Sequence, residues 1–109
     1  MRAAWWWALV VAWAALIFTL SSISDLGTGL GGWDLVLRKI AHAAEFAVLG
    51  FLLHRALRRD GWALALGIAY AASDELHQHF VPGRQGSPLD VLIDAVGVAV
   101  GVYVGRLRQ

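Results

Sequence analysis

Apolar residues gather in four segments of the chain, and each segment has about the length of a membrane-crossing helix. The first segment, residues 3–20, carries no charge and approaches the roughly 20 apolar residues that cross a hydrocarbon core. In the other three, polar residues are confined to one end, whereas a soluble bundle shows a polar stripe along every helix. The pattern therefore predicts an all-α integral membrane bundle of four transmembrane helices, at residues 3–20, 37–57, 61–80 and 89–107.

A secretory signal peptide is the alternative interpretation of the first segment, with Arg2 as its basic end. The apolar run exceeds the about 7–15 residues of a signal-peptide core, and no A-x-A-like cleavage site follows it. We therefore favour a retained transmembrane helix.

Composition agrees with lipid as the solvent. Of the 109 residues, 59% are hydrophobic and 16% are charged, which predicts one membrane domain over residues 1–109. The chain has no cysteine, so a disulfide framework and a thiolate metal site are excluded. A net charge of +1 argues against nucleic acid as a partner, because phosphate binding needs a basic face.

The charged residues orient the bundle. Six arginines fall on one side, which the positive-inside rule makes cytoplasmic: Arg2, Arg55, Arg58, Arg59, Arg106 and Arg108. Of the eight acids, only Asp60 lies on that side, and we expect no ionisable residue in the inner half of any helix. Both termini are therefore predicted to be cytoplasmic, and the other acids mark a one-sided pocket at the outer face.

Three of the predicted helices carry polar residues to this outer end. They are Lys39, His42 and Glu45 on the second, Asp74, Glu75, His77 and Gln78 on the third, and Asp90 and Asp94 on the fourth, with Arg84 and Ser87 in the loop above. A buried hydrogen-bond network that locks the helices in register is one interpretation. Interhelical polar bonds in membranes average about 0.6 kcal/mol, which is a weak reason to bury so many charges. We therefore predict a functional site.

Two kinds of chemistry suit these side chains. Histidine and carboxylate are ligands for a divalent metal such as Zn, Mn or Mg. The candidate ligands are His42, Glu45, Glu75 and His77, and the aspartates of the same cluster are also suitable. No H-E-x-x-H signature occurs, so the metal stays open. An anionic head group is the other ligand, with candidate binding residues Lys39, Gln78, Arg84 and Ser87. Candidate catalytic residues are His42, Glu45, Asp74, Glu75, His77, Asp90 and Asp94.

Small residues follow one stripe of the fourth segment. Asp90, Asp94, Gly97, Gly101 and Gly105 are spaced by three or four residues, so all five share one helix face. Glycines at such spacing let another helix approach closely, either within the bundle or in a homo-oligomer. We expect the face that packs inward to bring both aspartates with it.

The stretches KIAHAAEFAVLG and SDELHQHFVPGRQGSPLD, followed by VLIDAVGVAVG, resemble the VanZ-like family, which is named after a bacterial teicoplanin-resistance membrane protein. The resemblance covers nearly the whole chain, and D-E-x-H-Q-x-F-x-P-G-R-x-x-S-x-x-D is a specific motif. The matching positions are Lys39, His42, Glu45, Gly50, Asp74, Glu75, His77, Gln78, Phe80, Pro82, Gly83, Arg84, Ser87, Asp90, Asp94 and Gly97. The chain departs at Ala44-Glu45-Phe46, where many relatives carry a tyrosine or phenylalanine near the histidine.

The resemblance implies a small protein of the bacterial cytoplasmic membrane that is linked to glycopeptide (teicoplanin) tolerance, but it brings no settled mechanism. Two functions stay open. One is a hydrolase or transferase that acts on a lipid-linked phosphate or cell-wall precursor, although the K-x6-RP, PSGH and S-R-x5-H signatures of lipid phosphatases are absent. The other is a non-catalytic accessory protein that binds a glycopeptide, a lipid or a partner membrane protein through the same outer pocket.

Overall fold

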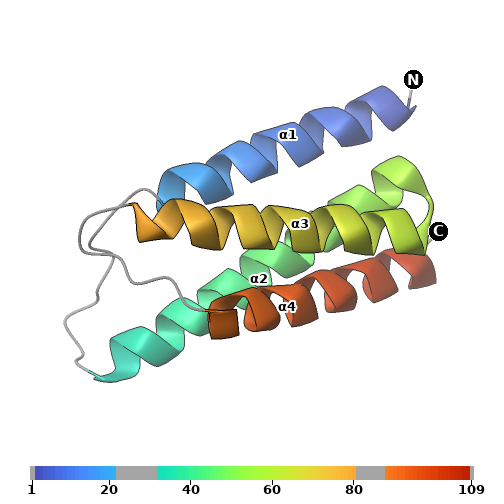
Figure 1. Cartoon of the computed structure of the whole chain (residues 1–109). Helices are drawn as coiled ribbons and strands as arrows, with labels where there is room; N and C mark the ends of the chain where they lie inside the picture. Colours follow the sequence, from blue (N-terminus) through green and yellow to red (C-terminus); the bar gives the residue numbers. More distant parts are fainter. Residues whose placement is uncertain (1, 22–31, 81–87, 109) are drawn as a thin grey trace.

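The computed structural model describes residues 2–21, 32–80 and 88–108, and within these ranges it has four helices and no strand (Figure 1). They are α1 (Arg2–Ser21), α2 (Gly32–Leu57), α3 (Asp60–His79) and α4 (Pro88–Leu107). The predicted all-α fold of four helices is confirmed. The helix α2 begins at Gly32, five residues before the predicted span of residues 37–57.

The helices lie side by side along the long axis of a 43 × 22 × 21 Å bundle. The start of α1, the connection from α2 to α3 and the end of α4 lie at one end (Figure 1). We call this the arginine end, because it carries Arg55, Arg58, Arg59, Arg106 and Arg108. The opposite end, which holds Asp74, Asp90 and Asp94, is the carboxylate end.

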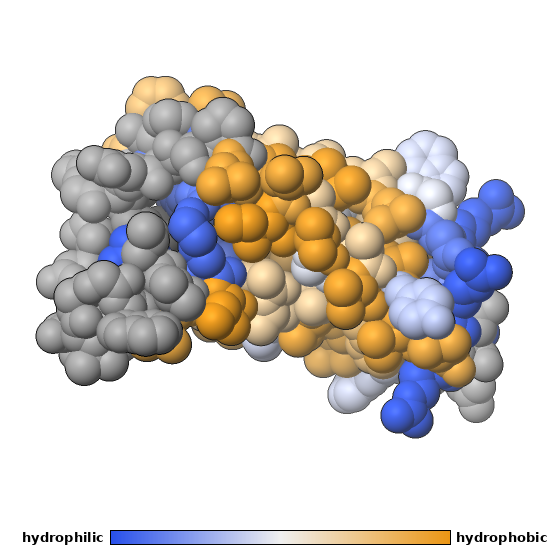
Figure 2. Space-filling model, turned by 90° about the horizontal axis from the view of Figure 1, so that it is seen from below, coloured by the Kyte–Doolittle hydropathy of each residue, from blue (hydrophilic) through white to orange (hydrophobic). Residues whose placement is uncertain are grey.

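The flank of the bundle is apolar. Figure 2 shows hydrophobic side chains over its middle and hydrophilic ones gathered toward its ends. On α4 most of the exposed apolar residues form a stripe opposite the glycines: Leu89, Leu92, Val96, Val100, Tyr103 and Leu107. By length and composition, one described segment, Leu37–Leu57, is long and apolar enough to cross a membrane, and the apolar Ala4–Leu20 is shorter. The four spans and the cytoplasmic termini therefore stay predictions.

The glycine stripe of α4 packs against α2. A Cβ atom added to Gly97 would overlap the Ala43 carbonyl, and one added to Gly101 would overlap the Ala47 carbonyl. Gly50 of α2 makes the same kind of close contact with α4, because it lies directly against the Val98 carbonyl. Such close approach is the usual role of glycines at this spacing in membrane helices. Because α2 of the same chain covers the stripe, the expected homo-oligomer stays a prediction that needs another face.

Two aromatic side chains tie α1 to the rest of the bundle. The Trp13 indole donates a hydrogen bond of 2.8 Å to the backbone carbonyl of Glu45 on α2. The Tyr70 hydroxyl on α3 donates one of 2.5 Å to the backbone carbonyl of Ala14. Indole and phenol groups among apolar side chains need such acceptors. Both bonds fix α1 beside the carboxylate half of α2 and α3.

Candidate functional site

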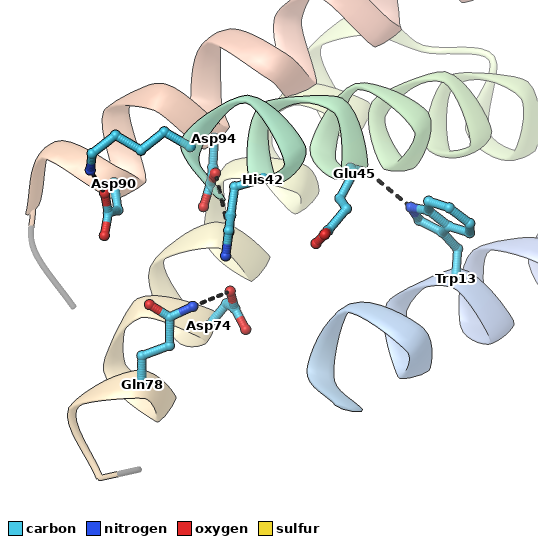
Figure 3. A network of polar contacts seen from close by, with 8 residues as sticks. Trp13, His42, Glu45, Asp74, Gln78, Asp90 and Asp94 are labelled. Carbon is cyan, nitrogen blue, oxygen red and sulfur yellow. Dashed lines mark hydrogen bonds and ion pairs between the residues drawn. The ribbon is translucent and has the colours of Figure 1, made fainter. Parts of the chain in front are cut away.

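Three side chains from three helices meet at the carboxylate end: His42 of α2, Asp74 of α3 and Asp94 of α4 (Figure 3). One ligand-type atom from each residue lies within 4.8 Å of the other two. Both aspartates are 3% exposed, and the histidine side chain is 17% exposed. The three residues thus form one buried group, which we call the His–Asp–Asp group.

The group arises because each member continues the buried stripe of its helix. Asp74 follows buried Ala71 by three positions on α3, and Asp94 precedes buried Val98 by four on α4. His42 precedes buried Phe46 by four on α2. Residues three or four apart share a helix face, so the stripes that form the core carry polar groups where they reach this end.

Hydrogen bonding within the group is incomplete. The distance from His42 Nδ1 to Asp94 Oδ1 is 3.8 Å, beyond hydrogen-bond length, and both atoms are buried. Neither atom has a hydrogen-bond partner among the residues that the structure describes. The Gln78 amide donates to Asp74 Oδ2 over 3.4 Å. Burying a polar atom without a partner costs free energy, so the pair of His42 and Asp94 is a costly feature of the fold.

An ion pair lies one turn nearer the end of the bundle. Lys39 Nζ is 2.6 Å from Asp90 Oδ1, and both side chains are partly buried. Lys39 precedes His42 by three positions and Asp90 precedes Asp94 by four. The ion pair therefore lies between the His–Asp–Asp group and the carboxylate end of the bundle. Because Asp90 engages Lys39, this pair is neutral by itself. The group below it holds two carboxylates against at most one imidazolium.

The remaining predicted residues are distributed differently. The His77 ring stacks on Phe18 of α1, with ring centroids 4.2 Å apart, and is outside the His–Asp–Asp group. The Glu45 side chain extends from α2 on the side facing α1 (Figure 3). Glu75 is half-buried on α3. Arg84 and Ser87 lie outside the described residues.

The ligand-type group therefore differs from the predicted metal ligands. Of His42, Glu45, Glu75 and His77, only His42 belongs to it. Asp74 and Asp94, which were expected as acid–base residues and as suitable further ligands, complete the group. The signal for both was in the sequence, because they share a face with the small residues of their helices.

Sequence reasoning missed a second polar cluster, at the arginine end. The His54 side chain is 1% exposed, and its Nε2 lies 2.7 Å from Asp60 Oδ1. Arg106 Nη1 lies 3.5 Å from the other oxygen of Asp60. His54 lies in the half of α2 nearer the arginine end, where no ionisable residue was expected from the sequence. As the only acid on that side, Asp60 was a signal that a cationic or donor partner would be near.

A tight turn explains this second cluster. Arg58 has a φ of 60°, the left-handed conformation that often ends a helix, and its N–H donates to the His54 carbonyl over 2.7 Å. The chain therefore reverses at once and brings the start of α3 back to His54. On α4, Gly105 provides the space against the His54 ring.

A helical bundle with an apolar flank and polar ends is the architecture of a helical membrane protein. A comparison with known protein families supports this class, because the VanZ/LLP1 family model matches residues 5–109. The chain therefore belongs to the VanZ/LLP1 family, as its motifs predicted. It is 40% identical over 75 residues to the uncharacterized membrane protein YwnJ of Bacillus subtilis (strain 168), and the match covers 67% of this chain. The chain spans about half of that relative, 53% of its length. No solved structure matches it.

Proposed function

We propose that the protein is a membrane-embedded hydrolase or transferase that acts on a lipid-linked phosphate at the carboxylate end. The observation that carries the proposal is the His–Asp–Asp group, a histidine buried with two carboxylates from three different helices. Buried ionisable groups inside a membrane protein are costly and usually mark function. Histidine and carboxylates are also the groups most used to move protons in catalysis.

We place the arginine end in the cytoplasm and the carboxylate end at the outer face, with all four helices crossing the membrane. The excess of arginine at one end supports this orientation. Trp5 and Trp62 are exposed near that same end, where interfacial tryptophans anchor a bundle. A 20-residue helix is about 30 Å long, which equals the hydrocarbon thickness, and α1, α3 and α4 each have 20 residues.

In the proposed reaction, His42 takes a proton from a water molecule that attacks the terminal phosphorus of a lipid diphosphate. The P–O bond to the remaining lipid monophosphate breaks, and inorganic phosphate leaves. Asp94 lies beside His42 and stabilises the imidazolium that forms. Lys39 lies one turn nearer the end of the bundle than His42. Its ammonium group is suited to bind a phosphate oxygen after it releases Asp90.

Glycopeptide tolerance follows from this proposal as a secondary effect. An outer-face enzyme acting on lipid-linked cell-wall precursors changes how many of them are exposed to the drug. The family resemblance supports the link to teicoplanin. The phenotype should therefore require the same residues as turnover.

A second candidate is a non-catalytic accessory protein that binds a lipid or glycopeptide at the same end. The burial of the group favours it, because side chains that are 3% exposed are closed to a large substrate in this conformation. Binding at the Lys39–Asp90 pair would then suffice.

Phosphate release from farnesyl diphosphate and from longer prenyl diphosphates tests the enzyme. The purified chain would be assayed in detergent beside His42→Ala, Asp74→Asn and the control Ser73→Ala. Ser73 is exposed and adjoins Asp74, but its hydroxyl only bonds the Tyr70 carbonyl. We expect a loss of about 100-fold or more in both site variants and none in the control. Turnover that survives both site variants would reject the mechanism, and substrate binding without turnover would favour the accessory protein.

A further inference from the structure

We infer that His42, Asp74 and Asp94 form a binding site for a divalent cation. The inference rests on the proposed function for the cation's role in a reaction, whereas binding itself is tested without turnover. The donor set is one imidazole nitrogen and two carboxylates, which suits Zn²⁺ or Mn²⁺. Three protein ligands leave coordination positions open for water or substrate, as catalytic metal sites do.

Charge is the first argument. Within the group, two buried carboxylates face at most one imidazolium, and Asp90 already engages Lys39. The arginine end uses the same three helices, but there the α4 residue is Arg106, which balances Asp60. Burying two carboxylates beside one imidazole costs free energy, and positive charge placed between them lowers that cost. A divalent cation supplies this charge, and the competing source is protons.

Geometry is the second and independent argument. Asp94 is 3% exposed, and its buried Oδ1 faces the buried Nδ1 of His42 at 3.8 Å without a hydrogen-bond partner among the described residues. Metal bonds of about 2.1 Å to both atoms span 3.8 Å at an angle of about 130°. The separation that is too long for a hydrogen bond therefore fits two ligands of one ion. The three atoms lie within 4.8 Å of one another, so the widest pair needs to close by up to about 1 Å to reach the same span.

The surroundings hold the ligands in place. Gln78 donates to Asp74 Oδ2, and such outer contacts orient metal-binding carboxylates. Ala43, next to His42, packs its carbonyl against Gly97, which is one turn from Asp94. The α2–α4 contact therefore fixes the spacing of His42 and Asp94 before any ion arrives. Sites on closely packed helices are more precise than sites on loops.

A cation here also removes a difficulty of the proposed function. Two carboxylates close together repel an approaching phosphate, and a bound divalent cation offers the phosphate an attractive partner instead. With the ion bound, His42 and Asp94 would serve as its ligands, and the ion would activate the attacking water as a Lewis acid in place of His42.

The test is metal binding by the untagged full chain in detergent, stripped with a chelator and then dialysed separately against Zn²⁺ and Mn²⁺. Elemental mass spectrometry would count ions per chain in wild type, His42→Ala, Asp94→Asn and the control Ser73→Ala. We expect about one ion per chain in wild type and control, and an affinity at least tenfold weaker in the site variants. Glu75→Gln separates this ligand set from the one predicted on sequence alone, and it should keep the ion.

Helix content by circular dichroism would accompany every sample. Should the site variants unfold, Co²⁺ titration of the wild-type chain decides, because histidine and carboxylate ligation changes the visible absorption of the ion. A folded wild-type chain that binds none of these ions would overturn the inference and leave protons as the source of positive charge. Binding that persists in both site variants would overturn it as well. An ion bound without turnover would reject the proposed reaction but not the cation site, and turnover by the stripped chain would remove the cation's catalytic role.

Discussion

The two ends of the bundle are built from the same parts and reach opposite charge balances. At each end α2 supplies a histidine, α3 an aspartate and α4 a third charged residue. The trio at the arginine end is His54, Asp60 and Arg106, and the trio at the carboxylate end is His42, Asp74 and Asp94. The third residue is a cation in one trio and an anion in the other.

This difference separates a structural network from a candidate site. At the arginine end, Asp60 has a donor at 2.7 Å and a cation at 3.5 Å, so its charge is balanced within the chain. At the carboxylate end, the third charge adds to the imbalance, and the nearest contact of His42 with Asp94 is too long for a hydrogen bond. Stability explains the first trio and does not explain the second.

The largest expected effect comes from disrupting the packing of α4 against α2, which positions the residues at both ends. Gly101→Leu places a side chain where even a Cβ overlaps the α2 backbone. We expect a loss of about 3 kcal/mol of unfolding free energy or more, because the two helices must separate. Unfolding in mixed micelles measures it, and turnover at the carboxylate end and the His54–Asp60 contact at the arginine end should be lost together. Val100→Leu adds a leucine on the neighbouring exposed position and should change little.

Asp94→Asn should lower turnover strongly and at the same time raise the stability of the fold. In the chelator-stripped chain it removes one of the two carboxylate charges of the His–Asp–Asp group, so we expect the unfolding free energy to rise by about 1 kcal/mol. Turnover should fall by about 100-fold. A variant that is less stable, with turnover intact, would mean that the carboxylate is part of a structural network, as at the arginine end.

His54→Ala is the matched change at the other end. The substitution removes a fully buried ring and its bond to Asp60, so we expect a loss of about 2 kcal/mol in unfolding free energy. Metal content and turnover of the folded protein should stay at the wild-type level. Loss of bound metal in a folded His54→Ala protein would contradict the separation of the two ends.

Local pattern predicted the helices, but not which polar residues meet. Apolar segments and the glycine spacing are properties of one stretch of chain, and they indicated four helices and the packing face of α4. The grouping of His42 with Asp74 and Asp94 depends on how far each helix is rotated and shifted against its neighbours. His77 lies only three residues from Asp74, yet it turns to Phe18 on α1. The bond from Trp13 to a backbone carbonyl had no signal in the pattern.

The smallest expected effect concerns the residue that distinguishes the two trios. Arg106 is 67% exposed and Asp60 is 41% exposed, so water and salt screen their 3.5 Å contact. Arg106→Gln should therefore lower the unfolding free energy by less than about 0.5 kcal/mol, a loss that high salt should mask. Unfolding of wild type and variant at low and high ionic strength measures it. A loss of unfolding free energy near that of His54→Ala would show that a counter-charge is as important at the exposed arginine end as in the buried His–Asp–Asp group. Burial would then not explain why the two trios differ.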